Sequence, residues 1–326
     1  MSSHLAGRAP GVTAPGWWPR VACVLLAIGA ALGVHVVWYL FVNTATGQAI
    51  DRAAFEGALF QQTQLWQIGR PVLDIVSGTL IVVGAGAAVV IAMVRRRAWL
   101  AIQALLVVVG ANATTQLVKD WYNRPRLLTG WTGQNSLPSG HTTVVAAASV
   151  ALLLTVPRRW RVVVAVIGAV WTVLTGLSTL VGRWHRPADV VAALLVACSW
   201  GAIACLVGSR RSLDTAGVSR SRFPTAAAGA LGLIALVSAI IAIGALVRLY
   251  NFGATGEAGA TLVADILARG ELTAYIGGIA AVLASVFGVF GALLWLRDAT
   301  LNADNRATVG YGARRMGVAM KPKEQM

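Results

Sequence analysis

The chain is poor in charged residues. Of its 326 residues only 12% are charged, while 57% are hydrophobic. A soluble domain usually has about a quarter of its residues charged, because charged side chains keep its surface in water. The shortage therefore excludes an ordinary soluble globular protein and predicts an integral membrane protein.

Cysteine is scarce as well. Cys23, Cys198 and Cys205 all lie inside apolar stretches, so the sequence indicates neither a disulfide framework nor a metal cluster. The net charge of +15 comes from short basic runs between apolar segments, which form no single basic face. This pattern is not typical of nucleic-acid binding. We therefore expect no metal, no cofactor and no nucleic-acid partner.

Long apolar runs, by contrast, are abundant. A helix needs about 20 apolar residues to cross the bilayer core. Eight segments meet this length or approach it, at 21–42, 72–93, 99–118, 140–156, 162–181, 190–207, 225–247 and 274–296. The sequence thus predicts an all-α, polytopic membrane helix bundle. The loop at 43–70 is long enough for a short surface helix, expected within 53–68.

The basic residues predict the orientation of these spans. If both termini are cytoplasmic, the inner segments hold 18 of the 27 basic residues, in agreement with the positive-inside rule. Residues 119–141 and 182–189 then lie on the outer face. The predicted parts are a cytoplasmic N-terminus (1–20), a six-span core (21–207), a cytoplasmic loop (208–224), two additional transmembrane helices (225–296) and a basic cytoplasmic tail (297–326).

A first group of cations ends the third span. Lys119 is the only lysine outside the C-terminal tail, and Arg124 and Arg126 follow it. Three cations on the outer face run against the positive-inside rule, so we expect an anion to compensate them, and phosphate is the simplest candidate. The alternative is that they are interface anchors whose charged ends reach lipid headgroups.

The tetrapeptide Pro138-Ser139-Gly140-His141 opens the fourth span. Proline suits a helix start, and serine can cap it. Glycine allows a ligand to approach the backbone closely. The free amides of the first helical turn form an anion site, with His141 beside it. A plain serine-capped helix with an interfacial histidine is the alternative interpretation.

The third group joins the fifth and sixth spans. His185 and Asp189 are four residues apart, which places them on one face of a helix. A carboxylate on one imidazole nitrogen leaves the other nitrogen free to act as a nucleophile. The alternative is a structural hydrogen bond at a helix start. All three groups are expected on the same membrane face.

Taken together, the three groups resemble the type 2 phosphatidic acid phosphatase family. The pattern of that family is Lys-x6-Arg-Pro, then Pro-Ser-Gly-His, then Ser-Arg-x5-His-x3-Asp. Lys119 and Arg126 fit the first motif, residues 138–141 fit the second, and Ser178, His185 and Asp189 fit the third. The resemblance covers about 119–189 and implies a six-helix lipid-phosphatase-like core, to which the last two spans are an addition.

The resemblance also implies a metal-independent mechanism. His185 would attack phosphorus and form a phosphohistidine, with Asp189 orienting it. His141 would protonate the leaving oxygen and then activate water. Lys119, Arg126, Ser139 and the amides near Gly140 would hold the phosphate.

Two positions depart from the family pattern. Leu127 stands in place of a proline, and Thr179 stands in place of a phosphate-binding arginine. Arg183 follows four residues after Thr179, so on a continuous helix it would lie on the same face. Arg186, beside His185, is the alternative, but we expect Arg183 to replace the missing arginine.

The predicted function is removal of phosphate from a lipid phosphate or a polyprenyl (di)phosphate. The site would lie in a bacterial inner (plasma) membrane and face the periplasm or cell exterior, with membrane lipids as its surroundings. Two alternatives remain. One is a phosphotransferase that passes the phosphoryl group to an alcohol. The other is a transporter or scaffold that binds lipid headgroups without turnover.

Overall fold

The computed structural model describes residues 17–58, 67, 71, 79–94, 98–128, 135–207, 223–252 and 261–319. Within these residues every regular element is a helix. The order is α1 (Trp18–Val37) with a π-helical extension η1 (Trp38–Val42), α2 (Ala45–Gly57), α4 (Thr79–Val94), α5 (Ala98–Trp121), α6 (Gly140–Thr155), α7 (Arg158–Val181), α8 (Pro187–Val207), α9 (Phe223–Tyr250), α11 (Leu262–Arg269) and α12 (Glu271–Ala319).

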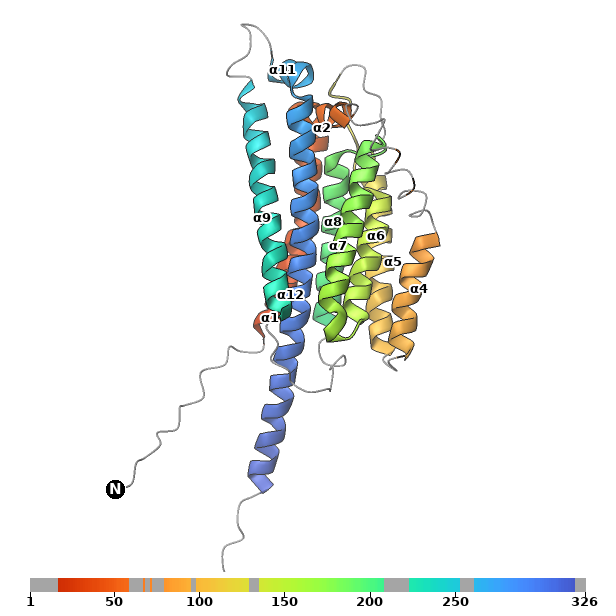
Figure 1. The fold of residues 1–326 in the computed structure, drawn as a ribbon, viewed down its shortest axis with the longest axis vertical. Helices are drawn as coiled ribbons and strands as arrows, with labels where there is room; N and C mark the ends of the chain where they lie inside the picture. The colour runs from red at the N-terminus through yellow and green to blue at the C-terminus, as the bar shows by residue number, and fades with distance from the viewer. Residues whose placement is uncertain are drawn as a thin grey trace, which may run out of the picture.

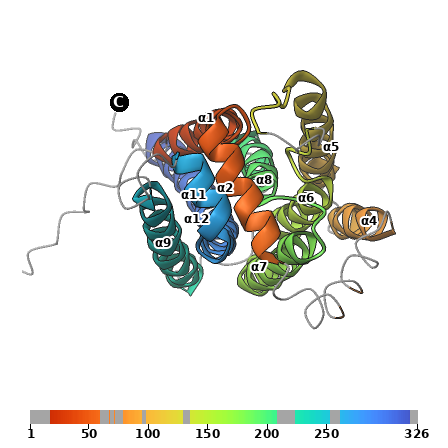
Figure 2. The same ribbon diagram turned by 90° about the horizontal axis from the view of Figure 1, so that it is seen from above.

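The long helices stand side by side, and the short helices α2 and α11 lie across one end of the bundle (Figures 1 and 2). Six helices in the described part of the chain are long and apolar enough to cross a membrane: Trp18–Val42, Ala98–Trp121, Arg158–Val181, Pro187–Val207, Phe223–Tyr250 and Glu271–Leu301. This confirms the prediction of an all-α, polytopic membrane protein.

The other two predicted spans are shorter in the structure. The fourth is α6, a 16-residue helix. The second is described only as α4, also 16 residues, because residues 72–78 lie outside the described part of the chain. The predicted N-terminal segment and the loop at 208–224 lie almost entirely outside it too.

Helix α6 is buried along nearly its whole length. It packs between α5 and α7 and touches α8, whose membrane-spanning part is also largely buried. A helix enclosed by others in this way does not need to match the bilayer thickness. Helices α5 and α8 come close together at Gly110 of α5. A Cβ at this position would lie 2.5 Å from the ring of Trp200 in α8.

The last two long helices are unequal in their packing. Helix α12 contributes residues such as Phe290 and Leu293 to the main hydrophobic core and contacts α2, α7 and α8. Its Arg297 donates to the carbonyl of Leu154 at 3.0 Å, and its Asp298 pairs with Arg158 at 2.9 Å. Helix α9 packs mainly along α12 and exposes most of its apolar side chains. Only α9 therefore has the character of an addition to the core.

Most of the surface helix predicted within 53–68 lies outside the described residues, but residues 53–57 belong to a helix that begins earlier. Helix α2 starts at Ala45 because Thr44 caps it, its hydroxyl accepting from the amide of Gly47 at 3.0 Å. It ends at Gly57, where a Cβ would lie 2.5 Å from the carbonyl oxygen of Glu271. Helix α2 is thus held against the start of α12.

The predicted cytoplasmic tail is helical over much of its length. Helix α12 continues past the membrane-spanning part, which ends at Leu301, and reaches Ala319 without interruption. In Figure 1 this extension projects beyond the other helices.

Candidate active site

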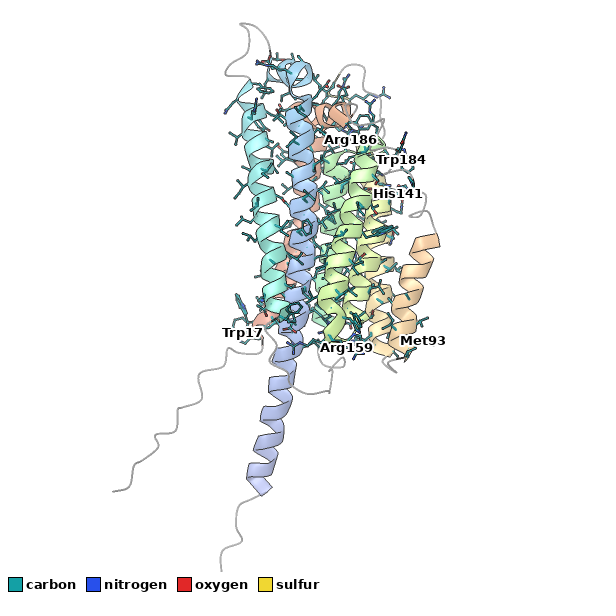
Figure 3. The ribbon with its side chains drawn as sticks, viewed as in Figure 1. Trp17, Met93, His141, Arg159, Trp184 and Arg186 are labelled. Atoms are coloured by element: carbon teal, nitrogen blue, oxygen red, sulfur yellow. The ribbon has the colours of Figure 1, made fainter. Side chains whose placement is uncertain are left out.

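The second and third motif groups lie at one end of the bundle. His141, Trp184 and Arg186 are near the end that carries α2, whereas Trp17 and Arg159 mark the opposite end (Figure 3). The segment that follows α5 reaches the same end as His141. The fold therefore brings together the residues that were expected to share a membrane face.

Asp189 lies in the first turn of α8 and is fully buried. Its Oδ2 lies 3.2 Å from Nδ1 of His185 and accepts from the hydroxyl of Ser136 at 2.7 Å and the amide of Arg186 at 3.0 Å. A carboxylate only accepts, so Nδ1 of His185 carries the proton of their bond. In the neutral form of this ring, Nε2 is then the nitrogen with the free lone pair.

The start of α6 is tied to the same carboxyl residue. The amide of Ser139 donates to the backbone carbonyl of Asp189 at 2.9 Å. The Ser139 side chain caps α6, its Oγ accepting from the amide of Thr142 at 3.4 Å and from the Thr142 hydroxyl at 3.1 Å. Ser139 is fully buried. The second and third motifs thus form one unit.

Lys119 and the two histidines surround the start of α6. A Cβ at Gly140 would lie 3.7 Å from Nζ of Lys119, so the ammonium group is close to the helix start. The ring centroids of His141 and His185 are 6.4 Å apart, and the ring of Trp184 lies 5.5 Å from that of His141. An ammonium beside the positive end of a helix is unfavourable without an anion. The space between the two imidazoles is suited to such an anion.

The model of the PAP2 superfamily matches residues 100–212. We call these matched residues the PAP2 region. The match confirms the resemblance to the type 2 phosphatidic acid phosphatase family. The PAP2 region runs from α5 to the end of α8 and contains all three motif groups. No curated protein and no solved structure matches the chain.

Within the PAP2 region the expectation of a continuous helix to Arg183 is wrong. Helix α7 ends at Val181, and Arg183 has a positive φ of 55°. The amide of Arg183 donates to the carbonyl of Leu180 at 3.0 Å, and that of Trp184 to the carbonyl of Thr179 at 3.0 Å. This is a Schellman-type helix end with arginine in the position that usually holds glycine.

The Arg183 side chain leaves the helix axis and covers another element. Its guanidinium lies 4.5 Å from the ring centroid of Phe55 in α2. Thr179 is fully buried, and its hydroxyl donates to the carbonyl of Gly176 at 2.7 Å. The residues packed around Thr179 therefore leave no space for an arginine side chain at this position.

Three residues outside the motif pattern support the PAP2 motifs, and of these the sequence analysis missed Ser136. Ser136 donates to Asp189 and accepts from Nη1 of Arg186 at 2.8 Å. Arg186 is only 7% exposed. Burial, followed by the nearby Arg186, lowers the pKa of Arg124, whereas Arg126, the predicted ligand, is exposed. The Arg-Pro pair at 124–125 was the available signal for Arg124.

Asp51 of α2 was also missed. It is 2% exposed, and its Oδ1 accepts from the amide of Ala188 at 3.4 Å. Burial and the nearby Asp189 raise its pKa to about 7, although Arg186 and Arg124 oppose the rise. With only 12 acidic residues in the chain, a carboxylate in an outer loop was itself a signal. Among the described residues no group of three His, Cys, Asp or Glu side chains is arranged to hold a metal ion.

Proposed function

We propose that the protein is a membrane lipid phosphatase that acts through a phosphohistidine. The substrate would be a lipid phosphate or a polyprenyl (di)phosphate. Membership of residues 100–212 in the PAP2 superfamily and six membrane-spanning helices support a membrane phosphatase. The observation that carries the proposal is the pair of facing imidazoles, one of them bonded to a buried carboxylate.

In this proposal His185 is the nucleophile. Its Nδ1 proton is held by Asp189 at 3.2 Å, so Nε2 attacks phosphorus and the P–O bond to the lipid breaks. Asp189 stabilises the positive charge that develops on the ring, and Ser136 and the Arg186 amide hold the carboxylate in place. This is the arrangement by which a buried carboxylate keeps a histidine in the reactive tautomer.

His141 supplies the proton transfers. Its ring lies 6.4 Å from that of His185 by centroids, a separation in which one phosphoryl group can touch both rings. In the first step His141 protonates the lipid oxygen, which leaves as an alcohol. In the second step it removes a proton from water, which attacks the phosphohistidine and releases phosphate.

Lys119 and the start of α6 would hold the phosphoryl oxygens. The Lys119 ammonium lies next to Gly140, and the first amides of the helix have no acceptor within the helix. Together they neutralise the charge that spreads over the oxygens in the transition state. Arg126 and Arg183 are the further candidate cations, while Ser139 holds the first turn of α6 in place.

Release of phosphate by the purified full-length protein tests the proposal. Farnesyl diphosphate and phosphatidate serve as substrates, with His185→Ala as the control that lacks the nucleophile. We expect turnover of at least one of the two lipids, no turnover by the variant, and full activity in EDTA, because protein cations do the electrostatic work. Full activity of His185→Ala, or a strict requirement for added magnesium, would contradict the mechanism.

We further propose that the site faces the periplasm or cell exterior. The 18 basic residues assigned to the opposite side support this orientation. A single cysteine introduced at exposed Asn123 should react with an impermeant maleimide added to intact cells, and one at exposed Arg159 should not. The three native cysteines are buried, which keeps the background low. The reverse labelling pattern would overturn this orientation.

A further inference from the structure

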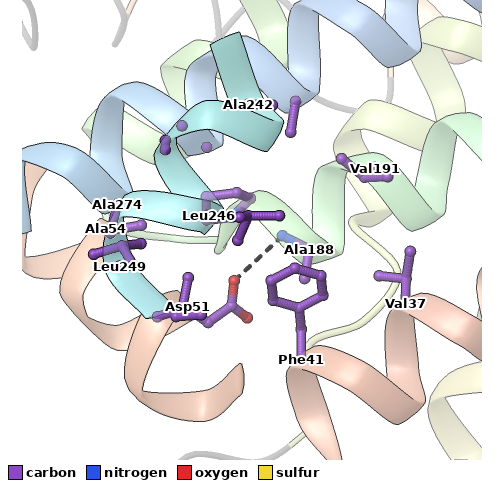
Figure 4. A pocket seen from close by; sticks show the side chains of 16 residues that line it. Val37, Phe41, Asp51, Ala54, Ala188, Val191, Ala242, Leu246, Leu249 and Ala274 are labelled. Atoms are coloured by element: carbon purple, nitrogen blue, oxygen red, sulfur yellow. Dashed lines mark hydrogen bonds between the residues drawn. The ribbon is translucent and has the colours of Figure 1, made fainter. Parts of the chain in front are cut away.

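A cavity lies beside the start of α8 (Figure 4). Its volume is about 190 Å³. The walls come from α1 with its extension, α2, α8, α9 and α12, and include Val37, Phe41, Val191, Leu246 and Ala242. Of the lining residues only Pro187, Ala188 and Val191 lie within the PAP2 region, so most of the cavity wall comes from helices outside that region.

Asp51 is the one polar side chain among the sixteen residues that line the cavity. Its Oδ1 accepts from the amide of Ala188. Its Oδ2 is buried and has no hydrogen-bond partner among the described residues. A buried oxygen without a donor is costly. The cavity is therefore apolar except for one hydrogen-bond acceptor, Oδ2 of Asp51, that has no donor among the described residues.

We propose that this cavity is a second lipid site, which takes the hydrocarbon chain of a long-chain alcohol and binds its hydroxyl group at Oδ2 of Asp51. An apolar cavity of 150 Å³ holds benzene, so 190 Å³ accommodates roughly six to eight carbon atoms. Two of the helices that wall the cavity, α1 and α9, leave most of their spanning surface uncovered by the rest of the protein.

A hydroxyl group suits Asp51 better than a cation does. The cationic side chains of Arg124 and Arg186 act on Asp51 electrostatically, and a bound ammonium would be repelled by both. Burial raises the pKa of Asp51 to about 7, so the group is not a strong counter-ion at neutral pH. A neutral O–H donor satisfies Oδ2 without adding a buried charge.

This site does not depend on the proposed phosphatase reaction. A long-chain alcohol is, however, the class of product that the reaction would leave. The binding test therefore uses no turnover, and its outcome is independent of the activity of His185.

Photolabelling of the full-length protein in phosphatidylcholine nanodiscs tests the inference. The probe is dodecanol carrying a diazirine at its sixth carbon, within the roughly six to eight carbon atoms that the cavity holds, and the labelled peptides are mapped by mass spectrometry. We expect labels on the cavity segments of α9 and α12. Unlabelled dodecanol should compete about five-fold better than dodecane at equal content in the membrane, the advantage of one net hydrogen bond.

Two substitutions in α9 form a matched pair. Ala242→Leu projects into the cavity and should lose most of the labelling, whereas Gly244→Leu should keep it, because no atom lies within 4 Å of a Cβ at Gly244. Asp51→Leu should abolish the preference for dodecanol. Farnesol and dioleoylglycerol as competitors then distinguish a prenyl alcohol from a glycerol lipid.

Two results would overturn the inference. One is the absence of labels on the cavity segments in the wild-type protein, a measurement that needs no variant to fold. The other is equal competition by dodecane and dodecanol, which would remove the role of Asp51.

Discussion

Asp189 and Asp51 are both buried beside the first turn of α8, but their surroundings differ. Oδ2 of Asp189 meets three donors, from His185, Ser136 and Arg186. Asp51 has a single bond, at 3.4 Å, to the amide of Ala188. A carboxylate with several donors is held ionised and in one orientation, whereas one with few donors favours a proton. Burial alone therefore does not decide what a carboxyl group does, and the number of donors around it does.

The largest expected effect is that of Asp189→Asn. The amide cannot accept from all three donors as a charged carboxylate does, and it leaves His185 in the wrong tautomer. We expect kcat to fall on the order of a hundred- to ten-thousand-fold. Asp51→Asn should reduce kcat by less than about ten-fold, since Asp51 has no bond to either histidine. If steady-state phosphate release fell equally in Asp189→Asn and Asp51→Asn, the different roles assigned to the two carboxyl groups would be wrong.

His141→Ala should follow, with a loss of about a hundred-fold or more for substrates that have alcohol leaving groups. The loss should be smaller for an aryl phosphate such as p-nitrophenyl phosphate, because its leaving group needs no proton. The measurement is the ratio of kcat/KM for the two substrates in wild type and variant. An unchanged ratio would remove His141 from the role of proton donor.

Arg183 and Arg186 both lie between α7 and α8, and their substitution should have smaller and different effects. Arg186 is buried and bonded to Ser136, so Arg186→Ala should lower the thermal unfolding midpoint. Arg183 is half-buried over Phe55, and Arg183→Ala should leave that midpoint nearly unchanged. If Arg183 binds the phosphate, its loss costs about ten- to a hundred-fold in kcat/KM.

Arg183→Lys separates charge from geometry at the same position. A lysine keeps the charge but not the planar fork of donors, so partial recovery is expected. Near-normal kinetics of Arg183→Ala, measured below the unfolding temperature of both variants, would show that the phosphate site uses other cations.

The smallest expected effect is a pH dependence of stability, which tests whether Asp51 is protonated in the folded protein. The pKa of Asp51 rises from 3.8 to about 7 on burial. Between these values the unfolded chain has lost its proton while the folded protein keeps it, so stability falls as the pH rises through this range. We expect the unfolding midpoint to drop by a few degrees from pH 5 to pH 8. Asp51→Asn should show a smaller drop, and an identical drop would contradict the assignment.

The sequence predicted most of the spanning helices because long apolar runs report directly on burial in a bilayer. It also predicted that residues 138–141 and 182–189 meet at one end, because alternating spans return the chain to the same face. These conclusions needed only local composition and the order of the segments. The clustering of His141, His185 and Asp189 followed from them.

The parts that were missed depend on contacts between distant segments. Nothing in the local sequence indicates that α2 covers the start of α8, so Phe55 could not be assigned to the site. The predicted span 162–181 ends where α7 ends, but the turn at Arg183 was missed because an arginine at positive φ carries no sequence signal. The inclusion of α12 in the core was missed because hydropathy does not distinguish a lipid-facing helix from an enclosed one.

The length of α12 sets a distance outside the membrane. The helix has 49 residues, and at 1.5 Å per residue it is about 74 Å long, more than twice the hydrocarbon thickness of a bilayer. Its spanning part ends at Leu301, and the 18 residues from 302 to 319 extend about 27 Å further. A domain or partner joined at that end would be held at a fixed standoff from the headgroups. For such a partner the helix would be a spacer, and shortening it by one turn would bring the partner about 5 Å closer to the lipid and rotate it little.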